Sequence, residues 1–159
     1  MKARVLLAMA AALCAAQPAS ACGTHLPEVQ AKIDAADLAE LLERTRIATQ
    51  EADEIFIGTV TDLVRPAVKP PGIGSVRFAV EQTLKGERSP VRTERWKAQF
   101  TFACRQSASF HDVGFRPGGT FIVYVRDGEV TRSAAADHLR SGLLGLDQER
   151  AIAAGGAPI

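Results

Sequence analysis

The sequence predicts a mainly β protein: a small closed barrel of five strands, with a long helix before the strands and a short helical segment after them. Five segments in the middle of the chain are rich in β-branched and aromatic residues and are separated by turn residues. The segment before them has helical spacing of its apolar residues. Closure into a barrel leaves no strand edge exposed, and the 159 residues suit one domain.

The chain begins with the features of a secretory signal peptide, which we place at residues 1–21. Lys2 and Arg4 precede an apolar run, Pro18 follows it, and residues 19–21 (Ala-Ser-Ala) match the small-residue pattern of a cleavage site. The run is about twelve residues long, too short for the ~20 that cross a bilayer. We therefore expect an exported protein, periplasmic or secreted, without a transmembrane segment.

Cleavage after Ala21 removes Cys14 and leaves two cysteines, Cys22 and Cys104. In an oxidising compartment a pair of cysteines favours one disulfide, with a free or metal-bound thiol pair as the alternative. Cys22 also directly follows the cleavage site, as the lipidated cysteine of a lipoprotein does. A lipid anchor at Cys22, and hence an outer-membrane location, is the alternative, although Ala19 stands where lipoprotein signals usually carry Leu.

Residues 28–50 are expected to form the long helix. Their apolar residues recur at spacings of three to five with charged residues between them, which predicts a helix that packs one face on the core. The residues on that face are Val29, Ile33, Leu38, Leu41 and Leu42, with Ile47 as a further candidate.

The strands are expected at residues 54–64, 75–84, 91–102, 120–125 and 129–132. Gly58 inside the first strand indicates a bulge, and the apolar run Thr-Phe-Ile-Val-Tyr-Val at 120–125 indicates a central strand buried on both faces. Asp127-Gly128 fits a tight hairpin turn. The barrel would then occupy about residues 53–132 and the C-terminal helical segment residues 134–154, within a single domain of residues 22–159.

The charge balance gives no reason to expect nucleic-acid binding. The chain has 19 Lys and Arg against 18 Asp and Glu, and loss of the signal peptide leaves 17 against 18. Glu94, Arg95 and Lys97 beside Trp96 resemble a ligand-binding strand face, but a neutral protein with few aromatic residues is not typical of oligonucleotide binding.

The sequence also lacks the motifs of enzymes and metal sites. His25, His111 and His138 have no metal-ligand spacing, and neither a phosphate-binding loop nor a nucleophile elbow is present. Ser107, Ser109, His111 and Asp112 lie close together in a polar loop, but closeness in sequence is not the geometry of a catalytic triad. We expect a non-enzymatic protein without a cofactor or metal; a small exported hydrolase is a remote alternative.

Four segments together resemble the netrin-like family, which includes the tissue inhibitors of metalloproteinases, and above all its exported bacterial relatives. They are ADEIFIGTV, VRFAVEQTLKGE, the isolated Cys104 and FRPGGTFIVYVRDGEVT, and the similarity spans roughly residues 22–132. The resemblance implies an OB-type Greek-key barrel with helices at its ends. It also implies that the amino-terminal Cys22 pairs with Cys104.

In the animal inhibitors of this family, the amine and carbonyl of the amino-terminal cysteine chelate the zinc of a target protease. The resemblance assigns this role to Cys22 and the filling of the protease cleft to Gly23 and Thr24. Thr24, however, stands where the inhibitors have a second cysteine. The principal hypothesis is therefore a monomeric exported binding module with an unidentified protein partner, and inhibition of a zinc protease is the alternative.

Replacement Cys104→Ser tests the disulfide. The bridge would close a loop of roughly eighty residues, so its loss should lower the free energy of unfolding by about 2–5 kcal/mol. The measurement is the melting temperature of both proteins in oxidising buffer, and an unchanged value would count against the bridge.

Overall fold

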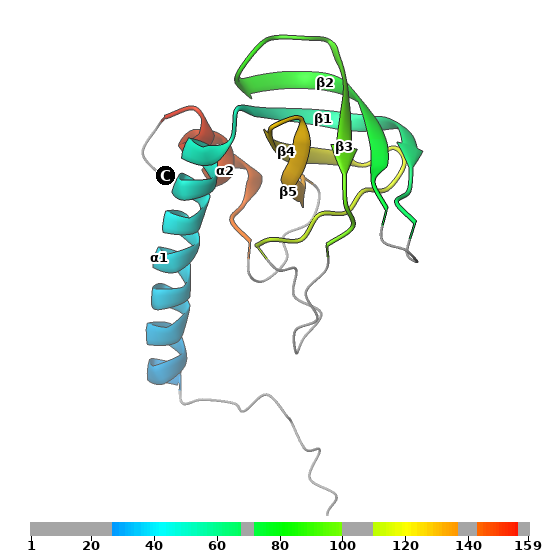
Figure 1. The fold of residues 1–159 in the computed structure, drawn as a ribbon. Coiled ribbons are helices and arrows are strands. Elements are labelled where there is room, and N and C mark those ends of the chain that lie inside the picture. The colour runs from blue at the N-terminus through cyan, green and yellow to red at the C-terminus, as the bar shows by residue number, and fades with distance from the viewer. Residues whose placement is uncertain (1–26, 68–71, 100–109, 137–142, 156–159) are drawn as a thin grey trace, which may run out of the picture.

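The computed structural model describes residues 27–67, 72–99, 110–136 and 143–155, with side chains from residue 34 onward. Figure 1 shows a long helix beside a barrel, with a short helix between them. In chain order the described elements are α1 (Pro27–Glu51), β1 (Glu54–Val64), β2 (Gly74–Lys85), β3 (Val91–Trp96), β4 (Thr120–Arg126), β5 (Glu129–Ala135) and α2 (Leu146–Ala153).

The five strands form a closed barrel in the order β1-β2-β3-β5-β4, which confirms the predicted fold class, an OB-type barrel flanked by helices. Neighbouring strands are antiparallel, except that β3 and β5 meet in parallel at Arg95 and Glu129. The bulge expected at Gly58 is present, because the β1–β2 register shifts between Ile57 and Gly58. A Cβ there would lie 2.9 Å from the carbonyl oxygen of Ala79, so the close approach of β2 requires glycine.

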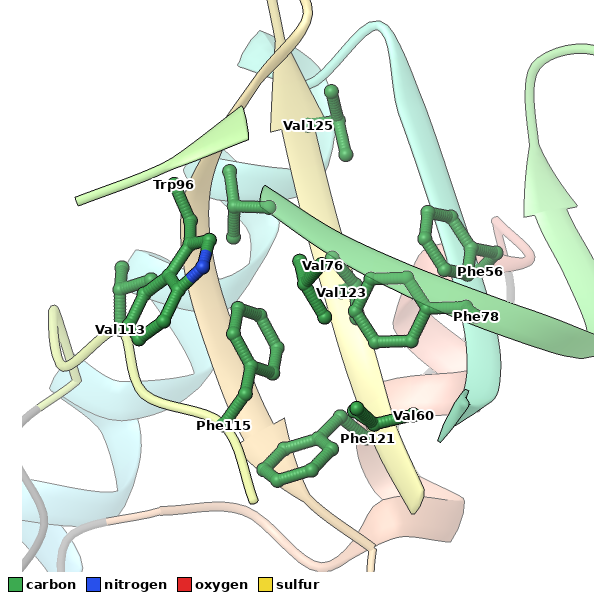
Figure 2. Close-up of a cluster of buried hydrophobic side chains, with 11 residues drawn as sticks. Phe56, Val60, Val76, Phe78, Trp96, Val113, Phe115, Phe121, Val123 and Val125 are labelled. Atoms are coloured by element: carbon green, nitrogen blue, oxygen red, sulfur yellow. The ribbon is translucent and has the colours of Figure 1, made fainter. Parts of the chain in front are cut away.

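The barrel interior is filled by aromatic and β-branched side chains (Figure 2). The Phe115 ring stands edge-on to three others, Phe78, Trp96 and Phe121, at centroid distances of 5.1–5.3 Å. Trp96 also donates its indole N–H to the carbonyl oxygen of Val64 at 3.2 Å. The interior is therefore a packed core and not a channel.

Strand β4 is buried on both faces, as its apolar run predicts. Phe121, Val123 and Val125 face the barrel interior, whereas Ile122 and Tyr124 belong to a second apolar cluster with Ala52 and Ala153 next to the helices. Both faces of the strand are covered from Phe121 to Val125, whereas Arg126 at its end is exposed.

Two predicted boundaries are wrong. The strand expected at residues 91–102 ends at Trp96, and beyond it Gln99 forms an isolated bridge with Val113. Residues 100–102 lie outside the described residues. Strand β5 extends through Ala135, where a helical segment was expected. Alanine favours helices, but Ala134 and Ala135 pair with Ile122 and Phe121, so sheet pairing overrides their propensity.

The expectation that α1 packs one face on the core holds only for its C-terminal half. Thr45 is buried, and Leu41, Leu42 and Ala48 are half-buried. Residues 34–40 are exposed, including Leu38 at 45%, and so is Ile47 at 44%. A helix of 25 residues is about 37 Å long, which is longer than the barrel beside it (Figure 1). Its N-terminal half therefore projects past the barrel.

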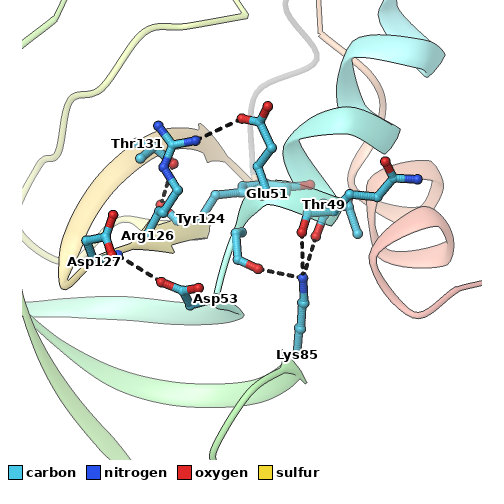
Figure 3. Close-up of polar contacts among 10 residues, drawn as sticks. Thr49, Glu51, Asp53, Lys85, Tyr124, Arg126, Asp127 and Thr131 are labelled. Atoms are coloured by element: carbon cyan, nitrogen blue, oxygen red, sulfur yellow. Dashed lines mark hydrogen bonds and ion pairs between the residues drawn. The ribbon is translucent and has the colours of Figure 1, made fainter.

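The end of α1 is fixed to the barrel by polar contacts (Figure 3). Lys85, at the end of β2, donates to the carbonyl oxygens of Thr49 (2.8 Å), Gln50 (3.1 Å) and Ala52 (2.5 Å). These carbonyls lie at the C-terminal end of the helix, where no amide of the helix can donate to them. A cation is also favourable there, at the negative end of the helix dipole. The carboxylate of Asp53 accepts a hydrogen bond from the amide of Asp127 at 2.8 Å, in the predicted β4–β5 turn.

Replacement Lys85→Met is expected to lower the free energy of unfolding by about 1–2 kcal/mol, because it removes the cation that satisfies three carbonyls at the helix end. Urea denaturation measures the loss. Lys97→Met is the matched control, since Lys97 makes only an exposed ion pair with Glu129 and should change stability by less than ~1 kcal/mol. Equal effects of the two replacements would contradict the capping role.

Candidate functional site

A pocket of about 320 Å³ lies between α1 and the barrel, and we name it the helix–barrel pocket. Its size is within the range of small-molecule sites. It is lined by side chains of α1, of the segment before Val113, of β4 and of β5, namely Arg44, Ile47, Ala48, Glu51, Phe110, His111, Arg126, Thr131 and Arg132. A second hollow, beside the β2–β3 turn, measures about 400 Å³ but has no aromatic side chain in its lining.

The inner wall of the helix–barrel pocket contains a buried ion pair between Arg132 of β5 and Glu149 of α2, whose side chains are 2% and 1% exposed. Both terminal nitrogens of Arg132 contact the carboxylate, one of them at 2.9 Å. The Nε of Arg132 donates to the carbonyl oxygen of Phe110 at 3.1 Å. This two-point geometry is the strong form of an arginine–carboxylate pair.

Arg132 is also enclosed by two aromatic rings. Its guanidinium carbon lies 4.3 Å from the ring centre of Phe110 and 4.8 Å from that of Tyr124. Burial lowers the pKa of Arg132, but the charges and hydrogen bonds of Glu149 and Tyr124 outweigh it, so the pKa is raised. Burial, followed by the charge of Glu149, also raises the pKa of Tyr124, whose hydroxyl donates to Glu149 at 3.4 Å. Arg132 therefore stays charged and Tyr124 stays protonated at neutral pH.

Sequence reasoning missed the Arg132–Glu149 pair. The alternation of Val130, Arg132 and Ala134 does mark Arg132 as a buried position, which was the available signal. The β4–β5 register shifts between Tyr124 and Val125, so Val130 faces the barrel interior whereas Arg132 faces α2. A bulge of this kind is not visible in the residue pattern.

The rim of the pocket is more exposed than the wall. Arg126 of β4 pairs with Glu51 of α1 at 3.0 Å, with side chains 49% and 58% exposed (Figure 3). Arg44, one helical turn from its partner Glu40, also lines the pocket, and Ile47 beside it is 44% exposed. The pocket thus has a fixed inner wall and a solvated rim.

Among the loop residues singled out in the sequence, His111 lines the pocket, and its ring stands edge-on to Phe110 at 5.2 Å. The backbone carbonyl of Asp112 accepts a hydrogen bond from the amide of Ser133 at 3.3 Å. Ser107 and Ser109 lie outside the described residues, so a grouping of these four side chains stays untested.

The strand face considered around Trp96 is divided between the two sides of β3. Glu94 and Trp96 are buried, whereas Arg95 and Lys97 are exposed. Burial raises the pKa of Glu94, opposed by the charge of Arg92, which lies 3.7 Å away and also pairs with Glu54. The charges of Arg92 and Glu94 are therefore paired within the barrel wall, whereas Arg95 and Lys97 face solvent, so these residues do not form one binding face.

The residues of the predicted disulfide, Cys22 and Cys104, lie outside the described residues, as do Gly23 and Thr24. The pairing and the role of Cys22 stay predictions. In the part of the chain that is described, no three His, Cys, Asp or Glu side chains are grouped to hold a metal ion. No described helix is long and apolar enough to cross a membrane.

No protein-family model matches the sequence, and no curated protein is significantly similar to it. The netrin-like resemblance therefore rests on the short segments quoted above.

Replacement Glu149→Gln is expected to lower the free energy of unfolding by about 3–5 kcal/mol, because it leaves the charge of Arg132 buried without a partner. The double replacement Arg132→Met with Glu149→Leu should cost less than Glu149→Gln alone, since no charge then remains buried. Denaturant titrations of the wild type and of both variants give the free energies of unfolding.

The control is Asp147→Asn on the same helix, where the pair with Arg150 is exposed and a change below ~1 kcal/mol is expected. A small effect of Glu149→Gln, similar to that of Asp147→Asn, would show that the buried pair does not hold α2 on the barrel.

Proposed function

We propose that the protein is an exported, non-enzymatic binding module of the cell envelope or extracellular space, and that its ligand occupies the helix–barrel pocket. The observation that carries this proposal is a pocket in which an aromatic ring, an aliphatic helix face and three guanidinium groups surround one hollow. Ligand sites combine apolar walls with a few polar groups that orient the ligand in this way.

The inner wall of the pocket favours binding because its geometry is set in advance. Arg132 is held by Glu149 and by the rings of Phe110 and Tyr124, and Phe110 is 6% exposed. A wall that does not rearrange costs the ligand little ordering entropy.

The guanidinium groups of the lining favour recognition of an anion. Guanidinium groups keep their positive charge throughout the working pH range, so they bind anions and do not exchange protons with a substrate. Inhibition of a zinc protease by Cys22, the alternative that the family resemblance suggests, would use a different part of the chain and does not conflict with a ligand in this pocket.

Replacement Ile47→Trp tests the location of the site. Ile47 is on the rim, so an indole there should extend over the pocket and weaken the binding of small molecules at least ~10-fold by occupying their space. The assay is a screen of a fragment library by the amide chemical shifts of the protein. Hits should shift the amides of Ala48 and Thr131 in the wild type and lose this effect in Ile47→Trp.

The control is Leu38→Trp, which adds the same ring to an exposed position of α1 outside the pocket. Fragments that bind both variants equally, or that shift only amides elsewhere, would contradict this assignment of the site.

A further inference from the structure

We infer that the helix–barrel pocket recognises a carboxylate joined to an apolar body. This inference rests on the proposed function, since it names the class of ligand for that site. Three features of the pocket support it: the guanidinium groups of the lining, an ion pair at the rim that can be exchanged at low cost, and an apolar wall.

The lining carries more positive than negative charge. Arg44, Arg126 and Arg132 face a single carboxylate, that of Glu51. Arg132 is already satisfied by Glu149 from behind the wall, so the cations available at the rim are Arg44 and Arg126. Glu40, the partner of Arg44, is not part of the lining. Arg44 and Arg126 both stand in exposed ion pairs, so an anionic ligand can take the place of either carboxylate.

The rim pair of Arg126 and Glu51 can be exchanged at low cost. Both side chains are about half exposed, and pairs of this kind contribute only about 0–1 kcal/mol. Glu51 is the last residue of α1, where the helix dipole disfavours a negative charge. Glu51 is held by one hydrogen bond from Arg126, at 3.0 Å. A ligand carboxylate can replace Glu51 and form two hydrogen bonds with the planar fork of Arg126.

The other walls are apolar. Ile47 and Ala48 of α1 lie on one side, and Phe110 forms part of the opposite side. Ile47 is 44% exposed, so a ligand that covers it gains from removing that surface from water. A bare anion would leave these walls in contact with water. The lining therefore favours an anionic head and an apolar body on the same molecule.

Two sources supply this chemistry: aromatic acids, including the C-terminus of a peptide with an apolar last residue, and aliphatic acids released from lipids. The probes are 4-phenylbutyrate for the first, octanoate for the second, and 4-phenylbutanol as the uncharged analogue of the first. Dissociation constants are measured on the mature full-length protein from the shifts of pocket amides, and inorganic phosphate is titrated as a bare anion.

At least one of the two acids should bind in the pocket about tenfold more tightly than phenylbutanol, because a charge-assisted hydrogen bond is worth about 1.5–3 kcal/mol. Arg126→Gln should weaken the acid about tenfold and change the alcohol less than about twofold. Glu51→Gln should act in the opposite direction and tighten the acid, since it removes the competing carboxylate. The better acid of the two identifies the source.

The matched control is Arg46→Gln, which removes the same charge from a position of α1 outside the pocket and should leave all constants within about twofold of the wild type. Thermal melts check that each variant is folded. A lower dissociation constant of the acid in Glu51→Gln is the decisive result, because a replacement that merely damages the fold does not improve binding.

Three results would overturn the inference. If acid and alcohol bind the pocket equally and Arg126→Gln affects neither, the pocket remains a binding site but not one for carboxylates. If inorganic phosphate binds as tightly as the acids, the apolar body is not recognised. If none of the probes binds and the fragment screen finds no hit in the pocket, the proposed function fails together with the inference.

Discussion

The buried pair of Arg132 and Glu149 is the interaction on which the arrangement of the helices depends. Helix α2 has only eight residues, and a helix of that length is not stable by itself in water. Its docking on the barrel combines the apolar packing of Leu146 and Ala153 with the two-point ion pair, which Tyr124 and the carbonyl of Phe110 support. A charged pair that is 1–2% exposed must be complete, because either partner alone would carry a desolvation penalty of several kcal/mol.

The same pair shapes the candidate site. Arg132 brings β5, the segment at Phe110 and α2 together, and its stacked guanidinium forms the inner wall of the helix–barrel pocket. On the outer side the C-terminal end of α1 is fixed by Lys85, which places Ile47, Ala48 and Glu51 opposite that wall. The walls of the pocket are thus fixed by the buried Arg132–Glu149 ion pair and by the partly exposed contacts of Lys85. Only the ion pairs at the rim are free to exchange partners.

Much of the fold could be predicted from the sequence, because the barrel strands obey local rules. The apolar run of β4 predicted burial on both faces, and Gly58 and Asp127-Gly128 predicted a bulge and a turn. The exposed half of α1 was not predictable, since apolar spacing at Leu38 does not reveal how far the barrel extends. The site was largely missed. Arg132 contacts Glu149 because of a register shift in β5 and because α2, which follows later in the chain, packs on that strand. The pattern of apolar and polar residues reveals neither.

Native-state hydrogen exchange measures directly whether the Arg132–Glu149 pair joins α2 and the barrel into one cooperative unit. The amide of Glu149, hydrogen-bonded to the carbonyl of Gly145 at 3.0 Å, reports on α2, and that of Val123 reports on the barrel. If the two form one unit, both amides exchange only through global unfolding, and their opening free energies agree within about 1 kcal/mol. An α2 amide that exchanges through local opening, several kcal/mol below Val123, would contradict it.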